Sequence, residues 1–119
     1  MKAGDVFYLP DAAGGHPNFA LEVFADGSVI TCNFTDYSNH ADKTCVIEDN
    51  EHPAITKKSA VYFRGAHHCE TEDALAALER LITSRKEPLS PELLARIRQG
   101  ALDSPRTSPK IKQALAGKK

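Results

Sequence analysis

The stretch Phe19 to Phe34, "FALEVFADGSVITCNF", contains two apolar runs separated by Ala25, Asp26 and Gly27. An Asp-Gly pair between two apolar runs is a strong β-hairpin signal, because glycine tolerates the positive φ that tight hairpin turns require. The first run alternates only loosely between apolar and polar residues. The stretch therefore predicts two antiparallel strands joined by a short turn.

Further short apolar runs lie on both sides of this hairpin. The segments "DVFYL", "TCVI" and "SAVYFRG" begin at Asp5, Thr44 and Ser59, and turn signals such as "DNEHP" separate them. Short strands with frequent turns are typical of a small antiparallel barrel or sandwich. We expect five to six antiparallel strands within the first 65 residues.

From Glu70 the apolar residues recur at helical spacing, which predicts one amphipathic helix to about Ser84. A second helix begins after Ser90 and Pro91, which suit the cap and the first helical position, and Gly100 lies where it would stop. The same Ser-Pro start recurs before the basic C-terminus. The fold class is therefore mainly β with C-terminal helices, an α+β arrangement. We expect residues 1–86 to form the barrel with its first helix and residues 87–119 to form a helical basic extension.

Length and composition restrict the function classes. The chain has 119 residues, 41% of them hydrophobic and 26% charged, which is ordinary for one soluble globular domain. No apolar run approaches the roughly 20 residues of a membrane-spanning helix. The start "MKAGDVFYLP" lacks the basic and apolar regions of a secretory signal, so we expect a cytoplasmic protein without membrane contact.

The net charge of −1 hides an asymmetry along the chain. Residues 1–70 carry 5 Lys and Arg against 10 Asp and Glu, and residues 71–119 carry 10 against 6. The two parts therefore have net charges of −5 and +4. A polyanion should meet the C-terminal part more easily.

The cysteines and histidines suggest a metal site at first sight, but their spacing disfavours one. Structural zinc sites use close pairs such as Cys-x-x-Cys, and no two of Cys32, Cys45 and Cys69 are within ten residues of each other. We expect free, partly buried thiols rather than nucleophiles or metal ligands, and we expect no cofactor.

Several polar residues near the hairpin are candidates for chemistry. His16 follows two glycines and precedes Pro17, and imidazole is a natural acid or base near neutral pH. Asn33 and Thr35 are two residues apart and so share one strand face, where a hydroxyl and an amide could bind phosphate or a carbonyl. Asp36 follows, and Arg64 is a candidate phosphate ligand. Loop histidines, strand-end Thr and Asn, and solvated arginines also occur without any function.

The order of these pieces resembles the MazF/PemK family of toxin-antitoxin toxins. "GDVFYLP", a loop ending in "HP", "VITCNFT" and "ITKKSAVYFRGAHHCETEDALAAL" are similar to the family's Gly-Asp strand, its Arg-Pro, its strand ending in threonine, its Lys-x-Ser strand and its C-terminal helix. The resemblance spans residues 4 to about 82. It implies an SH3-like barrel, a homodimer, an antitoxin protein as partner, and a metal-independent endoribonuclease that cleaves single-stranded RNA and leaves a cyclic phosphate.

The resemblance also implies the site residues. His16 stands where the family has a catalytic arginine, Thr35 matches the strand-end threonine, and His67 falls at the arginine after the Ser-containing strand. Apart from the resemblance, Asn33, Asp36 and Arg64 are the residues that we expect to bind substrate. Two histidines in place of arginines lose a permanent charge but could act as acid and base. The alternative is a non-catalytic SH3-like module that binds a protein partner in the same groove.

Overall fold

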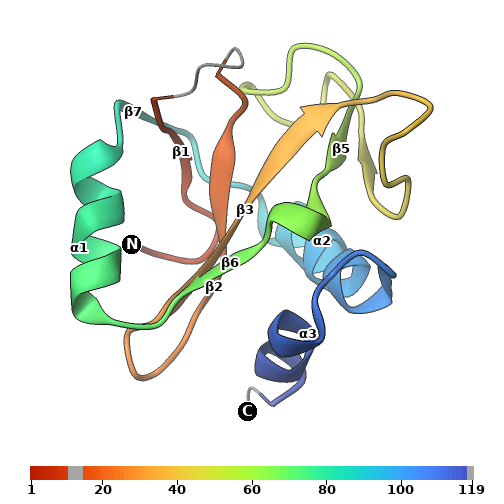
Figure 1. The fold of residues 1–119 in the computed structure, drawn as a ribbon. Coiled ribbons are helices and arrows are strands. Elements are labelled where there is room, and N and C mark those ends of the chain that lie inside the picture. Colours follow the sequence, from red (N-terminus) through yellow and green to blue (C-terminus); the bar gives the residue numbers. More distant parts are fainter. Residues whose placement is uncertain (11–14, 118–119) are drawn as a thin grey trace.

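The computed structural model describes residues 1–10 and 15–117, which form an antiparallel sheet with helices packed around it (Figure 1). Within these residues there are seven strands, three α-helices and one 3-10 helix. The fold class is therefore the α+β arrangement expected, mainly β with C-terminal helices. The elements in chain order are β1 (Val6–Tyr8), β2 (Asn18–Val23), β3 (Val29–Asp36), β4 (Val46–Ile47), β5 (Ser59–Val61), η1 (Phe63–Gly65), β6 (His67–Cys69), α1 (Glu72–Leu81), β7 (Ser84–Lys86), α2 (Pro91–Asp103) and α3 (Pro109–Ala116).

Strand β3 is the centre of the sheet. The strand order is β4-β5-β3-β2-β1-β7, and β6 also pairs with β3. One edge of β3 pairs with β2, while its other edge pairs with β6 near its start and with β5 near its end. The C-terminal end of β3 therefore lies between the start of β2 and β5.

The hairpin predicted from the sequence is confirmed as β2 and β3. Gly27 has a φ of +87°, and the Asp26 carboxylate accepts hydrogen bonds from the backbone N–H of Ser28 at 2.8 Å and its hydroxyl at 2.6 Å. The register shifts between Ala20 and Glu22, which marks a β-bulge. This bulge accounts for the loose alternation of the first run.

The helices after residue 86 share one hydrophobic core with the sheet. Ile97 and Ala101 of α2 and Ile111 of α3 are buried in the same cluster as Phe19 and Phe34. Both helices begin as predicted, with Ser90 and Ser108 each accepting a backbone hydrogen bond from the third residue on. Among the described residues, no helix is long and apolar enough to cross a bilayer. Lys118 and Lys119 of the predicted terminal helix lie outside the described residues.

The strand predicted from Ser59 to Gly65 is wrong in its second half. Strand β5 ends at Val61, and the 3-10 helix η1 follows over Phe63–Gly65. The turn at Tyr62 sends the Phe63 ring into the core, where it is fully buried. Tyr62 and Arg64 therefore do not share a strand face, as an uninterrupted strand would require.

The predicted end of the second helix at Gly100 is also wrong, because α2 continues to Asp103. A Cβ at Gly100 would lie 3.0 Å from the Phe63 ring and 3.1 Å from the Cys45 Cβ. Gly100 is therefore the point where α2 packs closely on the rest of the core, and this contact explains a glycine inside the helix.

We expect Gly100→Ala to lower the free energy of unfolding by about 1–3 kcal/mol, since an added methyl overpacks the core. The gain of about 1 kcal/mol in helix propensity offsets this only in part. Urea unfolding of the variant beside the wild-type protein measures the difference. A variant as stable as the wild type would contradict the packing role.

The first helix is shorter than expected and is followed by a strand that the sequence pattern did not indicate. Thr71 caps α1, accepting a hydrogen bond from the Ala74 N–H at 3.0 Å, and the helix ends at Leu81 rather than near Ser84. Strand β7 then pairs with β1 at the edge of the sheet. It consists of Ser, Arg and Lys, all exposed, so no apolar run marks it.

Candidate active site

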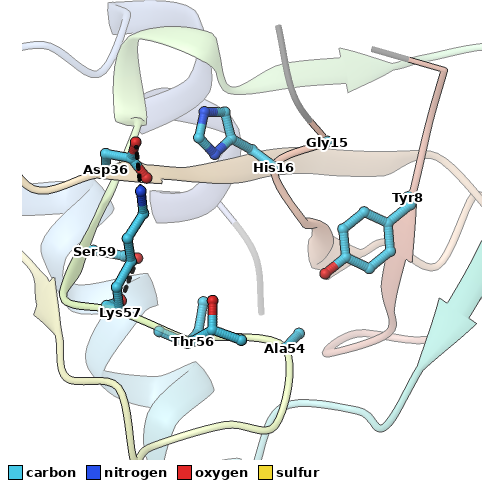
Figure 2. Close-up of a pocket in the computed structure, with 9 residues that line it drawn as sticks. Tyr8, Gly15, His16, Asp36, Ala54, Thr56, Lys57 and Ser59 are labelled. Carbon is cyan, nitrogen blue, oxygen red and sulfur yellow. Dashed lines mark hydrogen bonds and ion pairs between the residues drawn. The ribbon is translucent and has the colours of Figure 1, made fainter.

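A groove of about 380 Å³ lies at the C-terminal end of β3, between the end of β1, the start of β2 and the segment that leads into β5 (Figure 2). In Figure 2 the side chains of His16, Lys57 and Tyr8 surround the same hollow. Most of the lining residues are polar or charged. The groove is lined by Tyr8, Gly15, His16, Asp36, Ala54, Ile55, Thr56, Lys57 and Ser59.

The β2–β3 register brings His16 to the end of β3. Asn18 pairs with Asn33, and the Phe34 N–H donates to the Pro17 carbonyl at 3.0 Å. Continuing this antiparallel register places His16 opposite Thr35. Residues 11–14 of the loop before it lie outside the described residues. His16 thus lies at the end of β3, where it lines the groove, while Thr35 lines the cleft next to it.

Lys57 brings a permanent positive charge to the same groove. Its Nζ lies 3.1 Å from the Asp36 carboxylate, and its backbone carbonyl accepts a hydrogen bond from the Ser59 hydroxyl at 2.9 Å. Both charged side chains are more than half exposed, so the ion pair contributes little to stability. The ion pair matters for position, because Asp36 keeps the Lys57 ammonium group at the groove.

A buried histidine fixes the wall that carries Lys57. His52 is 5% exposed; its Nε2 lies 2.6 Å from the Glu87 carbonyl, and its Nδ1 lies 3.0 Å from the Ala54 N–H. The Ala54 N–H donates to Nδ1, and Nε2 is the ring nitrogen that donates to the Glu87 carbonyl. His52 is thus a structural residue that holds segment 52–57 against the segment before α2.

A smaller cleft of about 160 Å³ adjoins the groove, and Asp36 lines both. Thr35 lies in this cleft, together with side chains from the loop after β3 and from the turn between α2 and α3. The cleft is lined by Thr35, Asp36, Ser38, His40, Ala41, Asp42, Tyr62 and Arg106.

The loop that forms this cleft is tied to the C-terminal helices through Asp42. The Asp42 carboxylate accepts hydrogen bonds from the Thr44 hydroxyl at 2.6 Å, from the Thr44 N–H at 2.9 Å, and from the buried Ser104 hydroxyl. Burial raises the pKa of Asp42, but the bonds from Ser104 and Thr44 outweigh it, so the pKa lies below its ordinary value. The ionised carboxylate therefore stabilises the folded loop.

We expect Asp42→Asn to cost about 1–3 kcal/mol of stability at pH 7, because the donors on Thr44 and Ser104 lose a charged acceptor and one carboxylate oxygen is replaced by a donating NH2 group. The lowered pKa means that wild-type Asp42 contributes this stability fully above the unfolded value of about 4 and loses it as the pH falls through the folded value. Urea unfolding at pH 7 and pH 3 measures the difference, which should shrink at pH 3. The exposed Asp49→Asn is the matched control, and an equal cost in the two variants would contradict the role of Asp42.

The structure brings four of the six predicted site residues to the end of β3. His16 and Asp36 line the groove, and Thr35 and Asp36 line the adjoining cleft. Asn33 precedes Thr35 by two residues and lies with it on the outer face of β3, since Cys32 and Phe34 between them are buried. The common face predicted for Asn33 and Thr35 is therefore confirmed.

The other two predicted residues are placed elsewhere. His67 pairs with Thr31, four residues before Thr35, or about 13 Å along the strand at roughly 3.3 Å per residue. Arg64 lies exposed in η1. The adjacent His68 contacts the Ser28 hydroxyl at 3.0 Å at the far end of the hairpin. The structure therefore does not bring His16 and His67 into one groove.

Of the nine residues that line the groove, only His16 and Asp36 are among the site residues predicted from the sequence, and Lys57 and Tyr8 are the two large polar side chains that the prediction missed. Lys57 is the lysine of the quoted Lys-x-Ser motif, so the sequence contained a signal for it. Tyr8 ends the first strand, and nothing local distinguishes it from a half-buried strand residue. Only the pairing of β1 with β2 brings it beside His16.

The thiols have the character expected of packed cysteines. Cys32, Cys45 and Cys69 are free and buried, and burial raises the pKa of Cys32 to about 12. Such a thiol carries almost no thiolate near neutral pH and is a poor nucleophile. Among residues 1–10 and 15–117, no three His, Cys, Asp or Glu side chains are grouped in a way that could hold a metal ion.

Comparison with known proteins shows a likeness in fold. No protein-family model matches the sequence, and no curated protein sequence matches it. A solved structure described as "Endoribonuclease in complex with its cognate antitoxin from Mycobacterial species" is similar, with a TM-score of 0.59. It is 14% identical, and the match covers 87% of this chain and 92% of that one. The chain therefore shares its fold with an endoribonuclease that has been solved with its antitoxin.

Proposed function

We propose that this protein is a MazF/PemK-like toxin of a toxin-antitoxin system, an endoribonuclease that cleaves single-stranded RNA without a metal ion. The observation that carries the proposal is the groove at the end of β3, where an imidazole, a carboxylate and an ammonium group meet. The shared fold with an endoribonuclease supports it. The proposed setting is the cytoplasm, where messenger RNA is accessible.

The groove residues match the needs of cleavage by the 2′-hydroxyl. A base takes the 2′-OH proton, the 2′-oxygen bonds to phosphorus, and the bond from phosphorus to the 5′-oxygen breaks as an acid protonates that oxygen. His16 transfers one of these two protons as acid or base, and a water molecule of the open groove transfers the other. Lys57, held by Asp36, stabilises the negative charge of the pentavalent phosphorane. The products are a 2′,3′-cyclic phosphate and a 5′-hydroxyl.

Thr35 and Asn33 serve binding in this proposal. Their polar side chains follow the outer face of β3 toward the groove, and Thr35 lies in the cleft next to it. A hydroxyl and an amide bind phosphate or sugar without adding charge. His67 pairs with Thr31, and Arg64 lines neither the groove nor the cleft, so we leave both out of the proposed reaction.

The proposed partners beyond RNA follow from the toxin class. We propose an antitoxin protein that blocks the groove and a second copy of this chain that completes a homodimer. A solved relative in fold has been captured with its antitoxin, which supports the first of these.

The dependence on the 2′-hydroxyl tests the reaction class. Purified protein should cut a mixed-sequence single-stranded RNA and leave cyclic phosphate ends, while the same sequence in 2′-O-methyl form should stay intact. Cutting of the 2′-O-methyl form as well as the RNA would contradict attack by the 2′-hydroxyl. Failure of folded protein to cut either strand would favour the non-catalytic module that binds a protein partner.

A further inference from the structure

The cleft beside the groove has features of its own that the proposed reaction does not use. Tyr62 is 40% exposed, although most of the large apolar and aromatic side chains are buried. A Cβ at Gly65 would lie 2.6 Å from the Tyr62 ring, so the ring rests closely on the backbone of η1. The glycine thus permits a fixed, partly exposed aromatic ring at the cleft.

Arg106 brings a permanent charge to the same cleft from the C-terminal part of the chain. It lies in the turn between α2 and α3, where the Ser104 hydroxyl accepts a hydrogen bond from the Arg106 N–H at 3.1 Å. Ser104 and Thr107 of this turn are buried. The guanidinium Nη1 donates to the His40 carbonyl at 3.1 Å, which ties it to the loop after β3. The Arg106 guanidinium is therefore held in place by the turn and by the loop after β3.

The two carboxylates of the cleft are already engaged by other groups. Asp42 accepts its hydrogen bonds from Thr44 and Ser104, although the charge of Arg106 also attracts this carboxylate, and Asp36 pairs with Lys57. A guanidinium has five N–H donors, and one of them makes the bond to His40. The cleft can therefore receive an anion at Arg106, and the fixed ring of Tyr62 lies in the same cleft.

We infer that this cleft is a second subsite for one nucleotide of the RNA strand, next to the cleavage groove. Arg106 binds a phosphodiester, Tyr62 stacks on a base, and Asp36 lines both this subsite and the groove. The inference rests on the proposed endoribonuclease function. It assigns a role in substrate binding to the turn between the two C-terminal helices.

We expect substitutions of Arg106 and Tyr62 to have different effects in a binding experiment. The probe is a fluorescent 12-nucleotide 2′-O-methyl RNA of mixed sequence, which resists cleavage, titrated at several salt concentrations. Arg106→Ala should weaken binding about ten-fold and reduce the slope of log affinity against log salt by about 0.7, the value for one phosphate of a single strand. Tyr62→Leu should also weaken binding about ten-fold, but with an unchanged slope, because stacking involves no counterion release.

Arg80→Ala is the matched control, since it removes an exposed arginine from α1. It should bind as the wild type does. If Arg106→Ala and Tyr62→Leu keep wild-type affinity and slope while the wild-type protein binds and cleaves RNA, the subsite is overturned and the proposed function stands. If the folded wild-type protein neither binds the probe nor cleaves RNA, both are overturned. A loss of affinity in Arg106→Ala without any change in slope would indicate a loosened loop and would also contradict the phosphate contact.

Discussion

Replacing His16 by alanine should lower the rate of RNA cleavage by about 100-fold to 10,000-fold, the range for loss of a general acid or base. His16 lines the groove opposite Thr35, and in the proposed reaction it is the group that moves a proton at the reacting oxygens. The measurement is the single-turnover rate on a labelled RNA that contains one mapped cut site. The fold should be unchanged, since His16 lies in a half-buried loop position, and thermal unfolding checks this.

His67→Ala is the matched control for this experiment. His67 is also a histidine of the predicted site, but its place opposite Thr31 lies about 13 Å along β3 from Thr35. We expect the rate of His67→Ala to stay within about threefold of the wild type, since a proton cannot be transferred over that distance. Equal losses in the two variants would contradict the groove as the reaction site and would favour a site that includes both histidines.

Replacing Lys57 by alanine should lower the cleavage rate by about 100-fold to 1,000-fold, the effect of removing one group that stabilises a charged transition state. Lys57 is the ammonium held at the groove by Asp36. Because it acts on the developing charge of the phosphorane, its loss should reduce kcat more than it raises KM. Lys57→Arg should keep part of the activity, since it retains the charge with a different geometry.

The neighbouring lysine provides a control of equal charge. The Lys58 Nζ lies 4.2 Å from the centre of the Tyr37 ring. Lys58→Ala removes one positive charge from the same segment but leaves the residues that line the groove unchanged. Its rate should stay within a few-fold of the wild type at moderate salt. A loss as large as that of Lys57→Ala would indicate general attraction of the RNA rather than a specific role for Lys57.

Much of the fold could be predicted because its signals are local. The Asp-Gly turn, the Ser-Pro helix starts and the change from strand to helix spacing at Glu70 depend on neighbouring residues. The missed features depend on contacts between distant residues. Strand β7 forms because its backbone pairs with the edge strand β1. Gly100 resembles a helix stop in the sequence, and only its close contact with the Phe63 ring explains why a glycine lies inside α2.

The site could be predicted only in part for the same reason. His16, Asn33, Thr35 and Asp36 lie on one hairpin, so a correct register brings them together. Lys57 and Tyr8 come from other strands, and the position of Lys57 depends on a wall fixed by the buried His52. The prediction for His67 rests on the family resemblance, and the prediction for Arg64 rests on the phosphate-binding chemistry of its side chain. The turn at Tyr62 and the 3-10 helix after it determine where these two residues lie.

Cleavage of a long mixed-sequence single-stranded RNA by purified wild-type protein in EDTA tests the central claim most directly. The groove residues supply a proton-transfer group and a cation without a metal, so we predict discrete cuts that persist in EDTA. Intact RNA after incubation with folded protein, or cutting that EDTA abolishes, would contradict a metal-independent endoribonuclease at the end of β3.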